Sequence, residues 1–445
     1  MLGTEPAARG DDAWLLGWGL GYASVGAASL LVPLYAIDLG AGALLVSLVA
    51  ATAAFAGVPG AILWGRLVAT TKRRRPFVLV ALALTAAVLV TMPFYESPWT
   101  VLVANAALWF VVAAAAPVLN IIVVEGYETS AWSERFGLLN HYQGYGWLGG
   151  LVVGAVWSAV AGPVGFEPLR AKRLFFVAGG VAALAGLFVV YLWYPEKPTI
   201  SERRFVRLAE QFTGNGMLGR SVRAVPFGPQ RVYWALRDIR GGRGKLRSRF
   251  PRPLTRYLLA ATVFFTGFAV FFGPLPAYLT EAGYSTDQVF GLFVASSAAS
   301  AVSYTRVGSL AARLDPWRLQ TGALLSRVVA FPLVAFVGVL APPTGVVAAG
   351  VLFFAIGVTW AVISITATGL VTSLAPDSVR GEALGAYTAL GSLGGGVGSI
   401  LGGAVADGLG YGAAFGAAAV CVTAAVGLVV AGSSEGVPTD ALASD

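Results

Sequence analysis

The chain has 445 residues, of which 57% are hydrophobic and only 12% are charged, and its formal net charge is +8. A soluble domain carries about 25% charged residues, so this chain is too poor in charge to cover a water-soluble globule. Its single cysteine excludes an internal disulfide, and its single histidine leaves too few ligands for a cysteine or histidine metal site. We therefore expect a membrane protein that holds no metal and no cofactor.

Twelve apolar segments are each long enough to cross the roughly 30 Å hydrocarbon core of a bilayer. The segment before them, residues 1–13, has three acidic residues and one arginine, so it lacks the basic start of a cleavable signal peptide. The predicted helices lie near 14–37, 43–67, 76–94, 99–123, 136–160, 173–194, 256–279, 287–311, 317–340, 344–373, 381–405 and 409–431.

One long polar stretch divides these helices into two groups of six. Residues 195–256 hold fifteen of the 30 basic residues and only four acidic ones. Lys and Arg accumulate on the cytoplasmic side of membrane proteins, and the basic turn Lys72–Pro76 falls on the same side. Arg170, Lys172 and Arg173 fall on the opposite side, but they are fewer than the basic residues of the linker and the turn. We predict a plasma-membrane protein with cytoplasmic termini, divided into a tail (1–13), a six-helix bundle (14–194), a basic linker (195–255), a second bundle (256–431) and an acidic tail (432–445).

The charge of the linker has two interpretations, contact with nucleic acid and contact with anionic lipid headgroups. We favour lipid, because basic segments beside a membrane gain about 1 kcal/mol per charge there. Ser201–Phe212 also places Phe205, Leu208 and Phe212 near one helical face, as in helices that lie on a bilayer. The sequence GGRGK at Gly241–Lys245 lacks the strand–loop–helix setting of a phosphate-binding loop. We expect lipid contacts, no nucleic acid and no ATP-driven motor.

The sequence repeats itself. LVPLYAIDLG at Leu31–Gly40 aligns with LPAYLTEAG at Leu275–Gly283 at an offset of 243 residues, so that Pro33 matches Pro276. A second register at offset 248 matches the glycines of the fifth helix to those of the eleventh. Two copies of six helices that start on the same side form parallel repeats, an arrangement typical of transporters with two rocking halves.

The turn after the second helix carries a motif that resembles the major facilitator superfamily, whose usual form is G-x-L-x-D-R-x-G-R-R. Here Gly65, Leu67, Arg73 and Arg74 match, whereas Ala69 replaces the aspartate. The second copy keeps Gly308 and Arg313 and again has alanine, Ala312, at the aspartate position. The resemblance covers nearly the whole chain and implies an all-α fold of twelve transmembrane helices in two parallel six-helix repeats.

The fifth helix resembles a glycine pattern of proton-coupled exporters in this superfamily, although Leu151 replaces its proline. Glycines along one helical face let two helices approach closely where lipid supplies no hydrophobic drive between them. We expect packing faces at Gly146, Gly150 and Gly154 and at Gly394, Gly398 and Gly402.

Charged residues at helix ends are candidates for gates. Glu134 and Arg135 precede the fifth helix, Arg380 opens the eleventh, and Asp38 and Glu281 close the first and seventh at the opposite mouth. An exposed, screened pair that contributes little is the open alternative for the acid and base at the inner ends.

In this superfamily, helices one, four, seven and ten resemble cavity-lining elements, with two, five, eight and eleven beside them. Ser and Thr in such helices usually bond to their own backbone, whereas a tryptophan far from the interface is a better cavity candidate. The candidate cavity residues are Tyr22, Ser24, Asn105, Asn120, Gln143, Tyr145, Phe268, Ser296, Trp360, Ser364 and Tyr387.

No carboxylate lies in the middle of these eight helices. The candidates for proton coupling are therefore His141, Asp38 and Glu125, all near helix ends. A histidine satisfied by its neighbours is the alternative for His141. We expect Arg306 and Arg327 to snorkel toward the membrane surface rather than to bind an anion.

These features predict a monomeric transporter of a small organic solute that works by alternating access, either secondary active or facilitative, with export favoured over uptake. The alternative is a non-transporting sensor or lipid-handling protein, for which the altered Ala69 and Ala312 are the support. An enzyme is disfavoured, because the membrane segments hold no cluster of catalytic side chains and no nucleotide motif.

Overall fold

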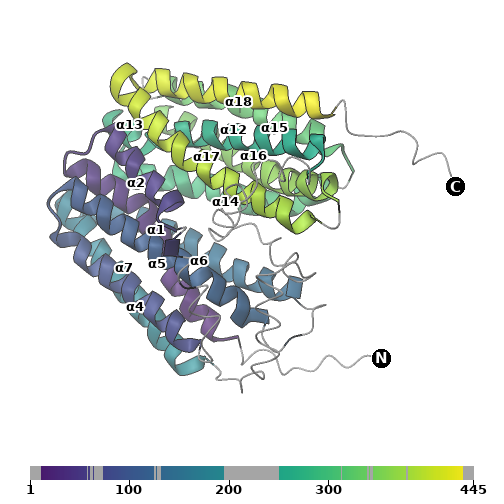
Figure 1. Cartoon of the computed structure of the whole chain (residues 1–445). Coiled ribbons are helices and arrows are strands. Elements are labelled where there is room, and N and C mark those ends of the chain that lie inside the picture. Colours follow the sequence, from purple (N-terminus) through teal and green to yellow (C-terminus); the bar gives the residue numbers. More distant parts are fainter. Residues whose placement is uncertain are drawn as a thin grey trace. The chain divides into compact units, whose positions relative to one another are not determined.

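The computed structural model describes residues 12–57, 59–60, 64, 74–124, 127, 132–194, 250–311, 313–337, 340, 344–376 and 379–433 (Figure 1). Every regular element in this part of the chain is a helix, which confirms the predicted all-α class. Gly65, Arg73, Glu125, both altered motif positions (Ala69 and Ala312) and most of the linker lie outside the described residues.

The contacts divide the chain into two units. Unit 1 comprises residues 1–230 and 276–294, and unit 2 comprises residues 231–275 and 295–445. The helices of unit 1 are α1 (Trp14–Asp38), α2 (Ala43–Phe55), α4 (Arg75–Thr91) with the 3-10 turn η1 (Met92–Phe94), α5 (Pro98–Val124), α6 (Trp132–Ala161) and α7 (Pro168–Trp193). The helices that follow are α12 (Arg252–Phe272), α13 (Leu275–Glu281), α14 (Thr286–Ala311), α15 (Pro316–Val337), α16 (Thr344–Leu374), α17 (Arg380–Leu409) and α18 (Tyr411–Ser433).

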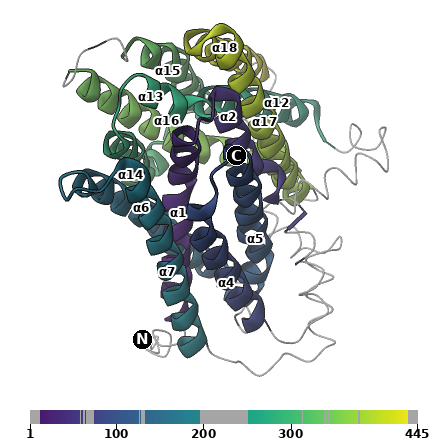
Figure 2. The ribbon, with the colours of Figure 1, turned by 90° about the vertical axis from the view of Figure 1, so that its left-hand side faces the viewer.

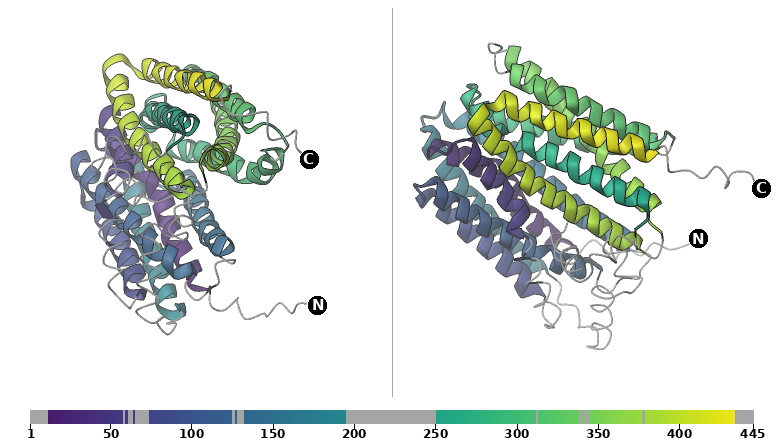
Figure 3. Two further views of the ribbon diagram at one scale, coloured as in Figure 1. Left: turned by 45° about the vertical axis from the view of Figure 1, so that its right-hand side comes forward. Right: turned by 45° about the horizontal axis from the view of Figure 1, so that its top comes forward.

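Ten helical segments of the described chain are long and apolar enough to cross a membrane. The other two predicted spans are α2, which has 13 residues, and α14, which has 26 residues but is less apolar. These two helices occupy the second position of each copy. Within unit 1, α1 lies beside α6 and α7, and α4 lies beside α5 (Figure 2). Within unit 2, α12 lies beside α17 and α18 (Figure 3).

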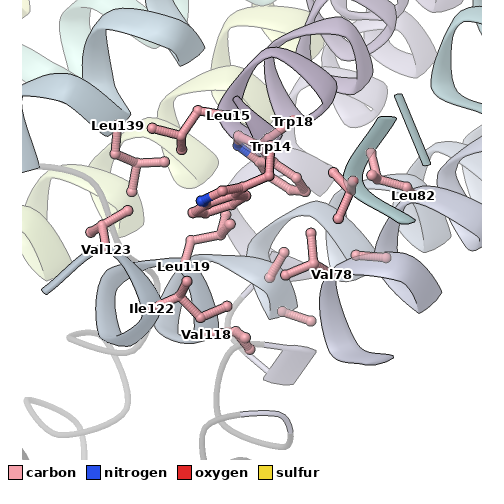
Figure 4. Packing of buried hydrophobic residues seen from close by; sticks show 14 of the residues in the cluster. Trp14, Leu15, Trp18, Val78, Leu82, Val118, Leu119, Ile122, Val123 and Leu139 are labelled. Atoms are coloured by element: carbon pink, nitrogen blue, oxygen red, sulfur yellow. The ribbon is translucent and has the colours of Figure 1, made fainter. Parts of the chain in front are cut away.

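The core of unit 1 is built where α1, α4, α5 and α6 meet. Trp14 and Trp18 of α1 point at Leu82 and Val78 of α4 and at Leu119 of α5 (Figure 4). All five side chains are at most 4% exposed. Large aromatic side chains bury more area than any aliphatic one, so the two tryptophans dominate this contact.

The repeated phrase ends both times in the same helix cap. Gly40 has φ +91° and Gly283 has φ +87°, a left-handed conformation that suits glycine because it has no Cβ. The hydrogen bonds of the two caps match at the same offset of 243. Gly40 N–H donates to Ile37 O, as Gly283 N–H donates to Thr280 O. Likewise Ala41 N–H donates to Ala36 O, as Tyr284 N–H donates to Leu279 O. The repeat therefore extends from the sequence to individual backbone hydrogen bonds.

The two copies differ at their proline kinks. Helix α1 runs without interruption through Pro33. Its counterpart stops at Phe272 and resumes as α13 at Leu275, since the second copy has Gly273 and Pro274 where the first has Leu30 and Leu31. Proline removes a helical N–H and clashes with the preceding turn, and two prolines so close together end the helix where one is tolerated.

Candidate functional site

Two glycines of α6 bring it into backbone contact with α1. A Cβ at Gly146 would collide with the carbonyl oxygen of Gly19, and a Cβ at Gly150 would collide with that of Ala23. The third predicted packing glycine, Gly154, faces the ring of Phe290, which belongs to the same unit. Any side chain at Gly146 or Gly150 would force α1 away, whereas one at Gly154 would require the Phe290 ring to shift.

The same kind of glycine-to-backbone contact, called a seam below, joins α17 to α12 in unit 2. A Cβ at Gly394 would lie 2.8 Å from the carbonyl oxygen of Thr262, and one at Gly398 would collide with that of Thr266. Thr262 and Thr266 stand 243 residues after Gly19 and Ala23, so the partners repeat as well as the glycines. Gly402 meets the backbone of Val270 in the same way. Each unit thus holds a helix pair in direct backbone contact.

Several polar residues, among them the predicted cavity residues Ser24 and Asn105, instead join helices within a unit. The Ser24 hydroxyl of α1 donates to Gly179 O of α7 at 2.7 Å. The Asn105 amide of α5 donates to Val49 O at 3.0 Å and to Thr52 Oγ1 at 2.6 Å, and so ties α5 to α2. In unit 2 the hydroxyl of Ser300 on α14 donates to Gly357 O of α16 at 2.7 Å. These bonds satisfy polar groups that a membrane interior leaves without water.

We expect Asn105→Ala to destabilise the protein by about 1–2 kcal/mol, because Thr52 and the Val49 carbonyl lose a buried partner. The measurement is thermal unfolding of purified protein in detergent. Asn120→Ala is the matched control, since Asn120 lies on the same helix, is half-buried, and makes no side-chain hydrogen bond to the described residues. Equal unfolding midpoints for the two variants would contradict a structural role for Asn105.

The end of α1 carries an ion pair whose lysine is buried. Lys172 Nζ of α7 lies 2.8 Å from both carboxylate oxygens of Asp38 and is 6% exposed. Beside it, the fully buried Tyr35 donates its hydroxyl hydrogen to Tyr95 O at 2.9 Å, and Arg173 Nε donates to the Tyr35 hydroxyl at 3.2 Å. Asp38, a candidate for proton coupling, is therefore the counter-charge of a lysine in this conformation.

At the other end of α1, Arg135 of α6 makes a two-pronged ion pair with Asp12, and its Nη1 lies 2.7 Å from one carboxylate oxygen. Arg135 also donates to Val123 O at 3.0 Å and lies 4.2 Å from the ring centre of Tyr127. Its predicted companion Glu134 is exposed. Arg135 thus joins the start of α1, the end of α5 and the start of α6.

The remaining gate candidates differ in exposure and in their contacts. Arg380 Nε donates to Thr372 O in the last turn of α16 at 3.1 Å, as expected for a cation near a helix carboxyl end. Arg74 is 8% exposed. Glu281 and Arg313 are exposed, and Gly308 faces open space.

Four aromatic rings, three of them half-buried and one, Trp18, buried, form a row in unit 1. Tyr22 lies 6.1 Å from both Trp18 and Trp147, and Trp147 lies 6.3 Å from Trp109, measured between ring centres. Of the predicted candidates, this row contains Tyr22 alone. His141 and Tyr145 are exposed on α6 with their rings 4.1 Å apart, and Gln143 is half-buried beside them.

Unit 2 has a corresponding group around Phe265, which stands 243 residues after Tyr22. Its ring centre lies 5.7 Å from Tyr387, 6.0 Å from Phe268 and 6.3 Å from Trp360. Phe265 is not among the cavity residues predicted from the sequence, although the repeat offset leads to it from Tyr22. Ser364 bonds to Ala361 O of its own helix, and the carbonyl of Ser296 accepts the Ser300 hydroxyl.

Arg327 of α15 lies behind this aromatic group. It is 1% exposed and donates to Thr359 Oγ1 at 3.1 Å and to Ile356 O at 3.0 Å. The expectation that Arg327 snorkels is wrong, because its side chain turns into unit 2 toward α12 and α16. Arg306 is exposed, as a snorkelling side chain requires.

A family model described as the Major Facilitator Superfamily matches residues 14–399. The chain belongs to this superfamily. It is therefore a multi-pass membrane transporter of small solutes, and the predicted membrane fold is confirmed. No curated protein matches it in sequence.

Solved structures of other superfamily transporters share the fold. A D323A mutant of the nucleoside transporter NupG has a TM-score of 0.69 at 11% identity, covering 95% of this chain and 98% of NupG. A bacterial homologue of the human lysosomal transporter Spinster has a TM-score of 0.63 at 14% identity, covering 97% and 96%. The human organic anion transporter MFSD10 has a TM-score of 0.54 at 18% identity, covering 96% and 100%.

Proposed function

We propose that this superfamily member carries a small organic solute across the plasma membrane by alternating access, with export as the favoured direction. The observation that carries the proposal is the repeated backbone seam of α1 with α6 and of α12 with α17. Helices in direct backbone contact move together, so each unit holds a rigid pair of the kind that alternating access requires. The neighbours named as nucleoside and organic anion transporters support a small organic solute.

The proposed direction, export, rests on the glycine pattern of α6, which resembles that of exporters.

Proton coupling would depend on two described groups, because Asp38 and His141 are the titratable candidates on α1 and α6. Asp38 is held by Lys172, whereas the exposed His141 has only ring neighbours, Tyr142 and Tyr145, among the described residues. With no carboxylate in the middle of these helices, facilitated diffusion fits better than proton-driven transport. We further propose a monomer with cytoplasmic termini whose basic linker contacts anionic lipid.

Transport is tested in proteoliposomes that contain a pH-sensitive dye and are supplied with a panel of small organic solutes. We expect solute flux, and a flux without pH change would indicate either facilitated diffusion or a sodium-linked system. A pH change that depends on solute and disappears in His141→Ala would establish proton coupling through that histidine. If folded protein moved no solute of the panel, the proposal would be replaced by the non-transporting sensor or lipid-handling protein.

A further inference from the structure

Unit 2 buries a guanidinium with one of its nitrogen atoms unused. Arg327 lies midway along α15 and is 1% exposed. Its Nε and Nη2 donate to Thr359 and Ile356 of α16, but its Nη1 has no hydrogen-bond partner among the described residues. An arginine guanidinium is charged at neutral pH. A buried hydrogen-bond donor on a charged group costs free energy when it has no acceptor. An acceptor that reached Nη1 would therefore be bound favourably.

The described part of unit 2 offers no counter-charge. Its described acidic residues are Asp315, Glu382 and Asp407, and none of them forms a salt bridge with Arg327. Asp315 precedes α15 and is twelve residues away, which corresponds to about 18 Å along a helix. Glu382 and Asp407 lie in the first and last turns of α17. A buried charge without an opposite charge is strongly unfavourable unless something else supplies one.

Aromatic rings, and not acidic side chains, are the neighbours of the guanidinium among the described residues of unit 2. Its central carbon lies 4.2 Å from the ring centre of Phe268, 5.7 Å from Trp360 and 5.8 Å from Phe331. Ring faces attract a cation weakly and carry no net charge, so they retain the cation without neutralising it. Trp360 and Phe265 are only half-buried, and their ring centres lie 6.3 Å apart, so these two rings are the members of the aromatic group with exposed surface beside the guanidinium.

We propose that Arg327 is the anion-recognition residue of this carrier and that its solute is an aromatic or similarly planar organic monoanion. A carboxylate would accept the unused Nη1 hydrogen, and the apolar body would lie on Phe265 and Trp360. The inference rests on the proposed transport function and names its substrate class. A compact inorganic anion has the same chemistry as the carboxylate, and the experiment below separates the two.

The test is ligand binding to the purified full-length protein in detergent, with benzoate and its neutral analogue benzamide as probes at constant ionic strength. Binding is read from the shift of the thermal unfolding midpoint and from tryptophan fluorescence. A charge-assisted hydrogen bond corresponds to roughly ten- to hundredfold in affinity, so we expect benzoate to bind tighter than benzamide by that factor. Arg327→Gln should reduce the ratio to about one, while Arg306→Gln, at an exposed arginine of α14, should preserve it.

Equal binding of benzoate and benzamide by the wild type overturns the inference, as does an unchanged ratio in Arg327→Gln. If Arg327→Gln fails to fold, the wild-type ratio and Arg327→Lys, which keeps the charge and should keep the preference, decide the question. Chloride that displaces benzoate completely at equal concentration would assign the site to an inorganic anion and contradict the organic solute. Binding in detergent without benzoate flux in liposomes contradicts transport alone, and flux of neutral solutes without a benzoate preference contradicts the anion site alone.

Discussion

Replacing Gly150 with valine is expected to destabilise the protein by about 3 kcal/mol or more and to abolish transport. Overpacking usually costs about 1–3 kcal/mol, and here the new side chain meets backbone rather than a side chain that can rotate away. Its Cβ would collide with Ala23 O and lie 2.7 Å from Ala27 N, so α6 would have to leave α1. Thermal unfolding in detergent and solute flux in proteoliposomes measure the two effects.

The neighbouring Gly149 provides the control, because a Cβ there meets nothing within 4 Å. Gly149→Val should leave the unfolding midpoint nearly unchanged, since valine is a slightly better helix former than glycine. The second copy repeats the design with Gly398 against Thr266 and with the open Gly395. If Gly150→Val and Gly149→Val behaved alike, the close approach of α1 and α6 would be refuted.

Asp38→Asn is expected to cost about 3 kcal/mol, because it leaves the buried ammonium of Lys172 without its counter-charge. The value lies at the low end of the range for broken buried pairs, since the side chain of Asp38 is 22% exposed and that of Lys172 is 7% exposed. The double variant Asp38→Asn, Lys172→Met should recover most of the loss, because an apolar replacement removes the unpaired charge as well. Thermal unfolding of the two single variants and the double variant gives the coupling energy.

Glu281 is the control position, as it matches Asp38 at offset 243 and is exposed. Glu281→Gln should change stability by less than about 1 kcal/mol. Additive effects of the Asp38 and Lys172 changes would show that the pair contributes no coupling, and Asp38 would again be free to carry protons.

The glycine seams could be predicted from the sequence because a glycine contact depends only on backbone and helical period. Gly146 and Gly150 meet Gly19 and Ala23 whatever the surrounding side chains are. The caps at Gly40 and Gly283 are predictable in the same sense, since a left-handed residue after a helix calls for glycine.

The polar side chains were harder to place, because spacing along a helix does not say which neighbour a face meets. Ser24 and Asn105 read as cavity candidates, yet each bonds to a helix of its own unit. Lys172 is a basic residue on the predicted outer side, where the orientation rule disfavours it. Its partner Asp38 is 134 residues away in the chain, so spacing along one helix does not reveal the pair. The snorkelling predicted for Arg327 is wrong because the sequence does not show the rotation of α15 about its axis, which turns this side chain inward.

The bond from Ser24 to Gly179 has a consequence for biosynthesis. The two residues are separated by 155 positions, and the Gly150 contact with α1 likewise joins distant parts of the chain. Ribosomes add about 5–20 residues per second, so α1 waits roughly 8–30 s before the α7 backbone that it bonds has been made. During that interval α1 exposes a face of small residues that suits close contact with any other helix. The first helix is therefore an element that the insertion machinery or a membrane chaperone would protect during synthesis.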